Sequence, residues 1–237
     1  MTDPATEDDR GATSPGRPRG WLTGVLVAVI AVGLLVAGGG LAVVLGIGRD
    51  EQPTTDSVAA GFSRDMSRHH LQSVEMANLA LTETEDPEIR QLAFDISATQ
   101  TNQLGRMQGW LSLWDLPFNG GEAMAWMSDG EMAGHDMTGE DMAGDDMAGT
   151  ALMPGMATEA ELAELRSLSG TAFDRMFLQL MIRHHQGGLA MAEYGREHSD
   201  VDVVERLARS IAETQDAETA TMAAMLRARG GEPLPAS

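Results

Sequence analysis

The apolar residues of this chain form two kinds of pattern. Residues 21–48 are an unbroken apolar run without a charged side chain, whereas residues 58–114 and 158–229 carry apolar side chains at the spacing of amphipathic helices. Because a helix needs only about 20 apolar residues to cross the hydrocarbon layer, the first run predicts a transmembrane helix. No stretch alternates apolar and polar residues as a half-buried strand does, so the pattern predicts an all-α fold.

The flanking charges predict how the membrane helix is oriented. Arg10, Arg17 and Arg19 precede it, while Arg49 is followed at once by two acidic residues. The positive-inside tendency then places residues 1–20 in the cytoplasm and the C-terminal part of the chain outside. A cleaved signal peptide is the alternative. The run is longer than a usual signal core and has no clear A-x-A site at its end, which favours an uncleaved, single-pass anchor in the cell membrane.

The rest of the chain contains an internal repeat, which is visible when the sequence is shifted against itself by 115 positions. In the first helix of each half, the shift aligns Phe62, Met66, His69, His70, Met76 and Ala77 with Phe177, Met181, His184, His185, Met191 and Ala192. In the second helix, it aligns Leu92, Ile96, Gln100, Met107 and Leu111 with Leu207, Ile211, Gln215, Met222 and Leu226. Each half is therefore predicted to be a helical hairpin, and two hairpins make a four-helix bundle.

Capping residues predict where these helices begin and end. Asp86 followed by Pro87 is suited to start the second helix, Thr158 with Glu161 forms a capping-box pattern for the third, and Ser199 can cap the fourth. The glycine pair and prolines of "RARGGEPLP" then end the fourth helix. The predicted segments are a cytoplasmic tail (1–20), a transmembrane anchor (21–48), a linker (49–57), a first hairpin (58–114), a Met/Asp/Gly-rich loop (115–157), a second hairpin (158–229) and a tail (230–237).

The loop between the hairpins differs from them in composition. Eight of the 17 methionines lie between Met124 and Met156. Four of them recur every five residues, namely Met132, Met137, Met142 and Met147. This interval does not match a helical face, and no Lys or Arg lies between Arg106 and Arg166. With a glycine in each repeat and little to drive packing, residues 115–157 are predicted to form a mobile acidic loop.

Helical geometry directs the two His-His pairs toward the bundle interior. On an ideal helix each pair shares the apolar face with two methionines. These faces hold Met66, His69, His70 and Met76, and Met181, His184, His185 and Met191. Adjacent histidines diverge by about 100°, so each is expected to join ligands from other helices. Met66 lies one turn from both histidines and can share a metal with either of them. Met76 lies about 10 Å beyond His69 along the helix axis, so it belongs to a second site or to the core. In the second half, Met181 corresponds to Met66 and Met191 to Met76.

Charge and cysteine content limit the chemistry of these side chains. The formal net charge is -20, from 36 acidic and 16 basic residues. A nucleic-acid binder needs a positive surface, so that class is excluded and cations are the expected partners. The chain has no cysteine, which excludes disulfides and thiolate metal sites. A soft metal must therefore be bound by methionine or histidine.

This ligand set favours copper. Thioether sulfur is soft and neutral, and imidazole suits copper, zinc, nickel and iron, so the combination points to copper and especially to Cu(I). An oxidising exterior strengthens the choice, because methionine is not lost to disulfide formation. The candidate metal ligands are His69, His70, His184, His185, Met66, Met76, Met107, Met181, Met191 and Met222 in the bundle and Met132, His135, Met137, Met142 and Met147 in the loop.

Simpler interpretations stay open for both regions. Methionine fills irregular cores, and a buried histidine is often only hydrogen-bonded. Duplication explains why four histidines match, but it does not explain their buried polarity, since an inward imidazole without a partner costs about 1–3 kcal/mol. The loop is either a solvated spacer or a weak copper collector with His135 as one ligand. His198 lies at a helix end and is interpreted as structural.

With these motifs the chain resembles the bacterial family named domain of unknown function 305, whose members are ferritin-like four-helix bundles with duplicated Met-x-x-His-His motifs. The resemblance covers roughly residues 54–229 and includes "MSRHH", "MIRHH", "FDRMF" and "MPGMAT". Some members are implicated in copper binding and copper tolerance outside the cytoplasm, so the resemblance implies that role for the paired histidines with Met66 and Met181. Ala59 stands where the second half has Asp174, so the two halves are not fully equivalent.

The sequence therefore predicts a membrane-anchored, extracytoplasmic copper-binding protein that buffers, sequesters or relays the ion, exchanging it with a donor or acceptor protein. No catalytic step is required. One alternative is a ferritin-like redox enzyme. The inward polar residues argue against it, because only one of them is a carboxylate: Gln100, Gln103, Gln215 and Glu218. The other alternative is a metal-free interaction module in which the histidines sense pH or hydrogen-bond within the core.

Overall fold

The computed structural model describes residues 20–44, 52–127 and 153–235. These residues belong to two compact units, residues 1–51 and residues 52–237. The first unit contains one helix, α1 (Gly20–Val44). Its segment Gly20–Leu41 has a mean hydropathy of 2.5 and is, by length and composition, able to cross a membrane. A helix of this kind near the N-terminus fits a membrane anchor or a signal peptide.

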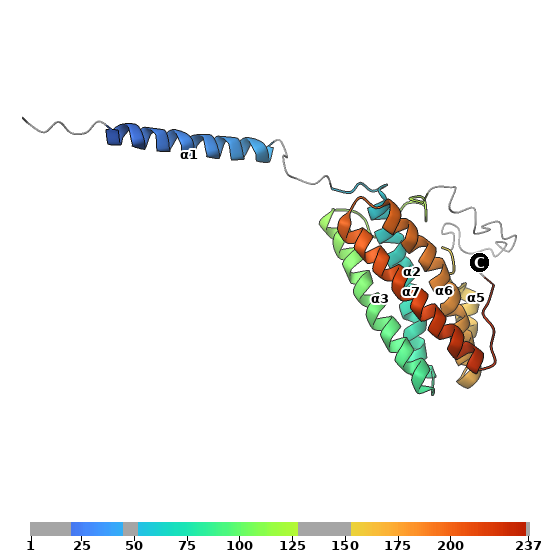
Figure 1. Cartoon of the computed structure of the whole chain (residues 1–237). Coiled ribbons are helices and arrows are strands. Elements are labelled where there is room, and N and C mark those ends of the chain that lie inside the picture. The colour runs from blue at the N-terminus through green and yellow to red at the C-terminus, as the bar shows by residue number, and fades with distance from the viewer. Residues whose placement is uncertain (1–19, 45–51, 128–152, 236–237) are drawn as a thin grey trace, which may run out of the picture. The chain divides into compact units, whose positions relative to one another are not determined.

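The second unit is a four-helix bundle, as predicted (Figure 1). Its long helices are α2 (Val58–Glu83), α3 (Pro87–Leu113), α6 (Gly170–His198) and α7 (Asp202–Ala228). Helix α2 packs on α3 to form the first hairpin, α6 packs on α7 to form the second, and α2 contacts α6 between the hairpins. The described residues contain no strand, so the all-α, ferritin-like prediction is confirmed.

Local capping explains most of the helix boundaries. Ser57 caps α2 by accepting a hydrogen bond from the backbone N–H of Ala60. Asp86 caps α3 by accepting from the next two backbone N–H groups after Pro87, as predicted. Helix α7 ends at the predicted glycine pair, where Gly230 has a φ of 69° and the N–H of the following glycine bonds back to the carbonyl of Leu226.

The predicted cap of the fourth helix was wrong. The residue that precedes α7 is Val201, and its side chain makes no capping hydrogen bond. Ser199 instead follows the last turn of α6, where its hydroxyl accepts a hydrogen bond from the backbone N–H of Val201 at 3.2 Å. The serine hydroxyl therefore orders the three-residue connection between the helices of the second hairpin.

The start of the third long helix also differs from the prediction. The capping box of Thr158 and Glu161 forms, but it starts a separate short helix, α5 (Glu159–Ser167), and the third bundle helix begins only at Gly170, whose φ is 55°. The extended backbone at Leu168 breaks the two helices apart. A capping box marks where a helix begins and carries no information on its length.

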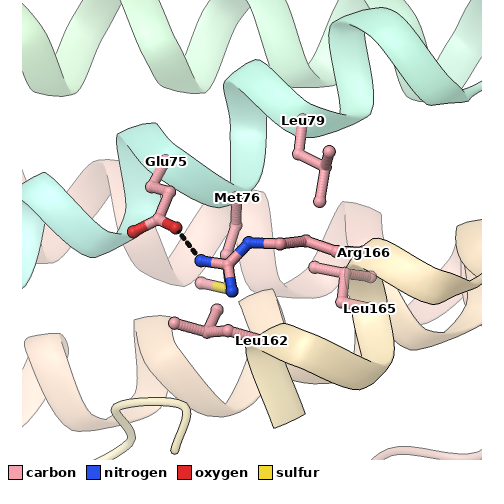
Figure 2. Close-up of a pocket in the computed structure, with 6 residues that line it drawn as sticks. All are labelled: Glu75, Met76, Leu79, Leu162, Leu165 and Arg166. Atoms are coloured by element: carbon pink, nitrogen blue, oxygen red, sulfur yellow. Dashed lines mark hydrogen bonds and ion pairs between the residues drawn. The ribbon is translucent and has the colours of Figure 1, made fainter. Parts of the chain in front are cut away.

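Helix α5 covers part of α2 through an apolar contact with a charged edge. Figure 2 shows Leu162 and Leu165 of α5 facing Met76 and Leu79 of α2 around a small pocket. Leu162 and Leu165 are buried, and an ion pair between Glu75 and Arg166 closes the edge of the pocket. Both charged side chains are about half exposed, so we assign the contact mainly to apolar burial.

Both described ends of the segment 115–157 pack on the bundle. Near the first end, the carboxylate of Asp65 accepts hydrogen bonds from the Trp126 indole at 2.9 Å and from the backbone N–H of Met124 at 2.8 Å. Near the second end, the Gln72 amide bonds to both the N–H and the carbonyl of Ala157, at 2.7 and 2.8 Å. The mobile loop was predicted for residues 115–157; the two ends of this segment are bonded to the bundle, and residues 128–152 lie outside the described residues.

Residues 153–157, here called the strap, lie against α6 at a glycine. A Cβ placed on Gly187 would be 2.0 Å from the carbonyl oxygen of Pro154. Gly155 has a φ of 77°, which an L side chain rarely adopts, and it contacts the backbone of Arg183. The strap can therefore lie this close to α6 only because both positions lack a side chain.

We expect Gly187→Ala to lower the free energy of unfolding by about 1–3 kcal/mol or more, because the clash is with backbone and cannot be relieved by a rotamer change. Urea unfolding of the chain measures the effect. Gly109→Ala is the matched control. That exposed helical glycine has no atom within 4 Å of an added Cβ, so the change should stabilise the bundle by about 0.5–1 kcal/mol. Equal effects at the two positions would contradict the strap contact.

Candidate metal centre

The four paired histidines meet in the interior of the bundle. His69 and His70 come from α2, His184 and His185 come from α6, and all four side chains have no exposed surface. The rings of His69 and His184 meet across the hairpin interface, with centroids 3.8 Å apart and planes tilted by 35°, and those of His184 and His185 are 6.4 Å apart. The four histidine side chains therefore point into the bundle, as helical geometry predicted.

Three of the four rings are held through Nε2 by an oxygen atom. The pairs are His69 with the Pro154 carbonyl at 3.1 Å, His70 with Gln103 Oε1 at 2.8 Å and His185 with Glu218 Oε2 at 2.7 Å. Because these oxygens are acceptors, we assign the proton of each neutral ring to Nε2. In a neutral ring the Nδ1 atom then carries a lone pair. A ligating histidine whose other nitrogen donates to an oxygen is the usual arrangement in metal sites.

The remaining nitrogens of the cluster have no hydrogen-bond partner among the described residues. They are Nδ1 of His69, His70 and His185 and both ring nitrogens of His184. The side-chain amides of Gln100 and Gln215, which are 2% and 3% exposed, are also unpartnered. Each such group costs about 1–3 kcal/mol when buried without a partner. Unpaired lone pairs at this density point to a ligand that the folded chain alone does not contain.

The donor atoms fit a soft or borderline metal ion better than a hard one. They are imidazole nitrogens and amide oxygens, and the carboxylate of Glu218 contacts His185. Among the described residues, no group of three or more His, Asp or Glu side chains is arranged to hold a metal. A bound ion would therefore be completed by sulfur or amide oxygen, or by a small shift of the rings.

Burial keeps three of the histidines neutral, namely His69, His70 and His184. Loss of hydration lowers the pKa of His69 to about 4, although its hydrogen bond to Pro154 acts in the opposite direction. The same cause, followed by the nearby His69, lowers the pKa of His70 to about 3. The pKa of His184 is also well below its usual value, first through burial and then through the other three histidines. Neutral rings at pH 7 have the free lone pair that metal binding requires.

These pKa values predict that the metal-free protein loses stability in mild acid. The folded values lie below the ordinary value of 6.5, so the unfolded chain binds protons that the folded chain does not between about pH 6.5 and pH 4. The free energy of unfolding should therefore decrease as the pH is lowered through this window, by up to about 1.4 kcal/mol per pH unit for each such histidine. Urea unfolding at about pH 7 and about pH 5 tests this, and equal stability at both would contradict it.

The six candidate methionines of the bundle are buried in two groups of three. One apolar cluster contains Met66, Met107 and Met191. The other contains Met76, Met181 and Met222. The shift of 115 positions converts one group into the other, so each half contributes to both. The sulfur of Met181 also accepts a hydrogen bond from the Ser73 hydroxyl at 3.2 Å. That these sulfurs serve as ligands stays a prediction.

The candidate ligands of the loop cannot be placed. They are Met132, His135, Met137, Met142 and Met147, and all lie outside the described residues. His198 is separate from the cluster, as expected for a structural residue: its Nδ1 bonds to the Tyr194 carbonyl at 3.1 Å, and its ring stacks on Tyr194 with centroids 4.0 Å apart.

Of the three groups that hydrogen-bond to the paired histidines, the sequence predicted two and did not predict the third. Gln103 and Glu218 were expected opposite the histidines, and each contacts one of them. The Pro154 carbonyl on His69 was not expected, because a main-chain oxygen has no side-chain signature. The available signal was Gly155 after Pro154 together with the helical Gly187, a combination that allows close backbone approach.

Comparisons with known proteins agree with this arrangement. A DUF305 protein from Streptomyces coelicolor, described as a candidate secreted protein, is 42% identical, with 77% of this chain and 99% of that chain covered and a TM-score of 0.66. A DUF305 fragment from Deinococcus radiodurans is 32% identical, with 75% and 99% covered and a TM-score of 0.57. CopM in its Cu(II)-bound form is 25% identical, with 73% and 97% covered and a TM-score of 0.53.

No curated protein sequence matches the chain. The family model named "Domain of unknown function (DUF305)" matches residues 59–226, a range that includes both hairpins and all four paired histidines. That match covers more than half of the chain and agrees with the similar structures. This protein therefore belongs to the DUF305 family.

Proposed function

We propose that this protein is a membrane-anchored, extracytoplasmic copper-binding protein that buffers or relays copper, with Cu(I) preferred. The observation that carries the proposal is the set of unpartnered nitrogen atoms on four fully buried histidines. A bundle that needed these positions only for packing would be more stable with apolar side chains there. The relative CopM has been solved with Cu(II) bound, which supports copper as the ion.

The proposed ligands are the inward lone pairs of His69, His70, His184 and His185, joined by thioether sulfur from Met66 and Met181. The oxygen atoms of Gln103 and Glu218 orient two of the rings by accepting their Nε2 protons. The surrounding core excludes water from the rings, which have no exposed surface. The absence of cysteine in the chain and the soft character of methionine favour Cu(I) over zinc or iron.

The proposed location follows from α1 and its flanking charges. Arginines precede the helix and acidic residues follow it closely, which favours a cytoplasmic N-terminus and an external bundle. Outside the cytoplasm, a copper site built from histidine and methionine has no thiol to lose to oxidation. In this proposal the Met/Asp-rich loop collects copper at weak sites, passes it to the bundle, and a partner protein supplies or receives the ion.

We expect Cu(I) to raise the thermal stability of the full chain in detergent. A ligand that binds only the folded state adds about 2.7 kcal/mol of stability when its free concentration is 100 times its Kd. Thermal unfolding with and without Cu(I), under reducing conditions, measures this. Unchanged unfolding, together with no copper uptake in competition with a chromogenic Cu(I) chelator, would contradict the proposal and favour a metal-free interaction module.

A further inference from the structure

A surface groove between α3 and α7 is lined by acidic side chains. Its walls include Asp95 from α3 and Glu213, Thr214, Glu218 and Thr221 from α7. None of the residues that line it is Lys, Arg or His. Three carboxylates facing one groove create a negative potential that concentrates cations near it. We call this feature, defined by these five residues, the α3–α7 groove.

The groove touches the histidine cluster through Glu218. One carboxylate oxygen of Glu218 lies 2.7 Å from Nε2 of His185. The Glu218 side chain is 18% exposed while that of His185 is fully buried, so Glu218 connects the groove to the interior. Within the described ranges, the Nδ1 of His185 has no hydrogen-bond partner. A fully buried imidazole of the histidine cluster therefore lies directly behind the groove wall, with its Nε2 toward Glu218.

The internal repeat provides a built-in comparison, because each groove residue has an equivalent 115 positions away. The three carboxylates Asp95, Glu213 and Glu218 are matched by Ser210, Ala98 and Gln103, and Thr221 is matched by Arg106. The equivalent surface thus has no carboxylate and gains a guanidinium. The two halves share their buried helix faces, yet they differ completely in these charges. Folding alone gives no reason to place all three acids on one side.

We propose that the α3–α7 groove is the site through which a metal cation enters the bundle, with Glu218 as the positioning residue between the groove and His185. The equivalent surface around Gln103 and Arg106 does not admit ions. This inference rests on the proposed copper-binding function and adds the route by which that site is reached. Asp95 and Glu213 attract the cation electrostatically, and Glu218 brings it next to the first buried imidazole.

Metal uptake by the full chain in detergent tests the route. Cu(I), supplied as its cationic acetonitrile complex, is mixed with the protein, and the reaction is stopped at set times with a chromogenic chelator that removes weakly held ions. The double variant Asp95→Asn/Glu213→Gln should take up copper about three- to tenfold more slowly at low ionic strength, and the difference should shrink in salt. The control Glu164→Gln/Glu193→Gln removes the same charge from exposed positions on α5 and α6 and should match the wild type.

The copper uptake rates of the wild type, the groove variant and the control variant test the entry route separately from copper binding itself. A slower groove variant beside an unchanged control supports entry through the groove. Equal rates in all three proteins, or equal slowing in both variants, would overturn the entry route while leaving copper binding intact. If the wild-type chain takes up no Cu(I) at all, the proposed function is wrong, and the entry route is overturned with it.

Discussion

A variant in which His69, His70, His184 and His185 are all leucine should bind Cu(I) at least about 100-fold more weakly than the wild type. The change removes every imidazole of the cluster, and loss of even an outer partner of a ligating histidine typically costs 10–100-fold in affinity. Leucine has a volume similar to histidine and suits these fully buried positions, so the bundle should fold. Competition with a chromogenic Cu(I) chelator measures the affinity, and circular dichroism checks the helix content.

His198→Ala is the matched control for this variant. It removes a histidine from the same helix as His184, about 20 Å away along the axis, where the ring bonds to Tyr194. Its Cu(I) affinity should equal that of the wild type. Tight binding retained by the four-leucine variant would assign the copper to the methionine clusters or to the loop, and it would remove the bundle histidines from the account.

The second large effect concerns the metal-free protein, which should become more stable when His184 is replaced by leucine. Both nitrogens of this ring are buried and find no hydrogen-bond partner in the described part of the chain, and burial holds its pKa well below the usual value. Leucine removes that penalty at similar volume, so the free energy of unfolding should rise by about 1–3 kcal/mol. Urea unfolding in the presence of a metal chelator measures the difference.

This prediction separates a metal site from an ordinary buried histidine. His198→Leu should give no such gain, because its Nδ1 already has a hydrogen-bond partner. If His184→Leu instead destabilised the metal-free chain, the ring would be serving the core, and the simpler interpretation of the His-His pairs would hold. A stabilised variant that no longer binds copper would show that the bundle gives up stability to keep open ligands.

Much of the fold could be predicted because the repeat encodes it twice. The match of His69 with His184, and of Gln103 with Glu218, fixed which faces point inward and which residues meet there. Period and capping signals are local, so they located the long helices and the start of α3 at Asp86. The break before Gly170 and the cap of α7 depend on packing between segments, which short-range patterns do not describe.

The closest partner of His69 depends on tertiary contacts in the same way. Pro154 lies 85 positions from His69, and its contribution is a carbonyl oxygen that any residue could supply. Gly187 appears in the sequence only as a weak helix former, and its purpose becomes evident when the strap is in place. The two groups of three methionines likewise follow from how the hairpins pair, which the spacing within one helix does not determine.

X-ray absorption at the copper edge of the Cu(I)-loaded full chain shows which atoms bind the ion. We expect imidazole nitrogen together with sulfur in the shell of atoms nearest to copper, and we expect the nitrogen signal to disappear in the four-leucine variant. A wild-type spectrum with sulfur or oxygen neighbours only, unchanged by the four replacements, would contradict this expectation.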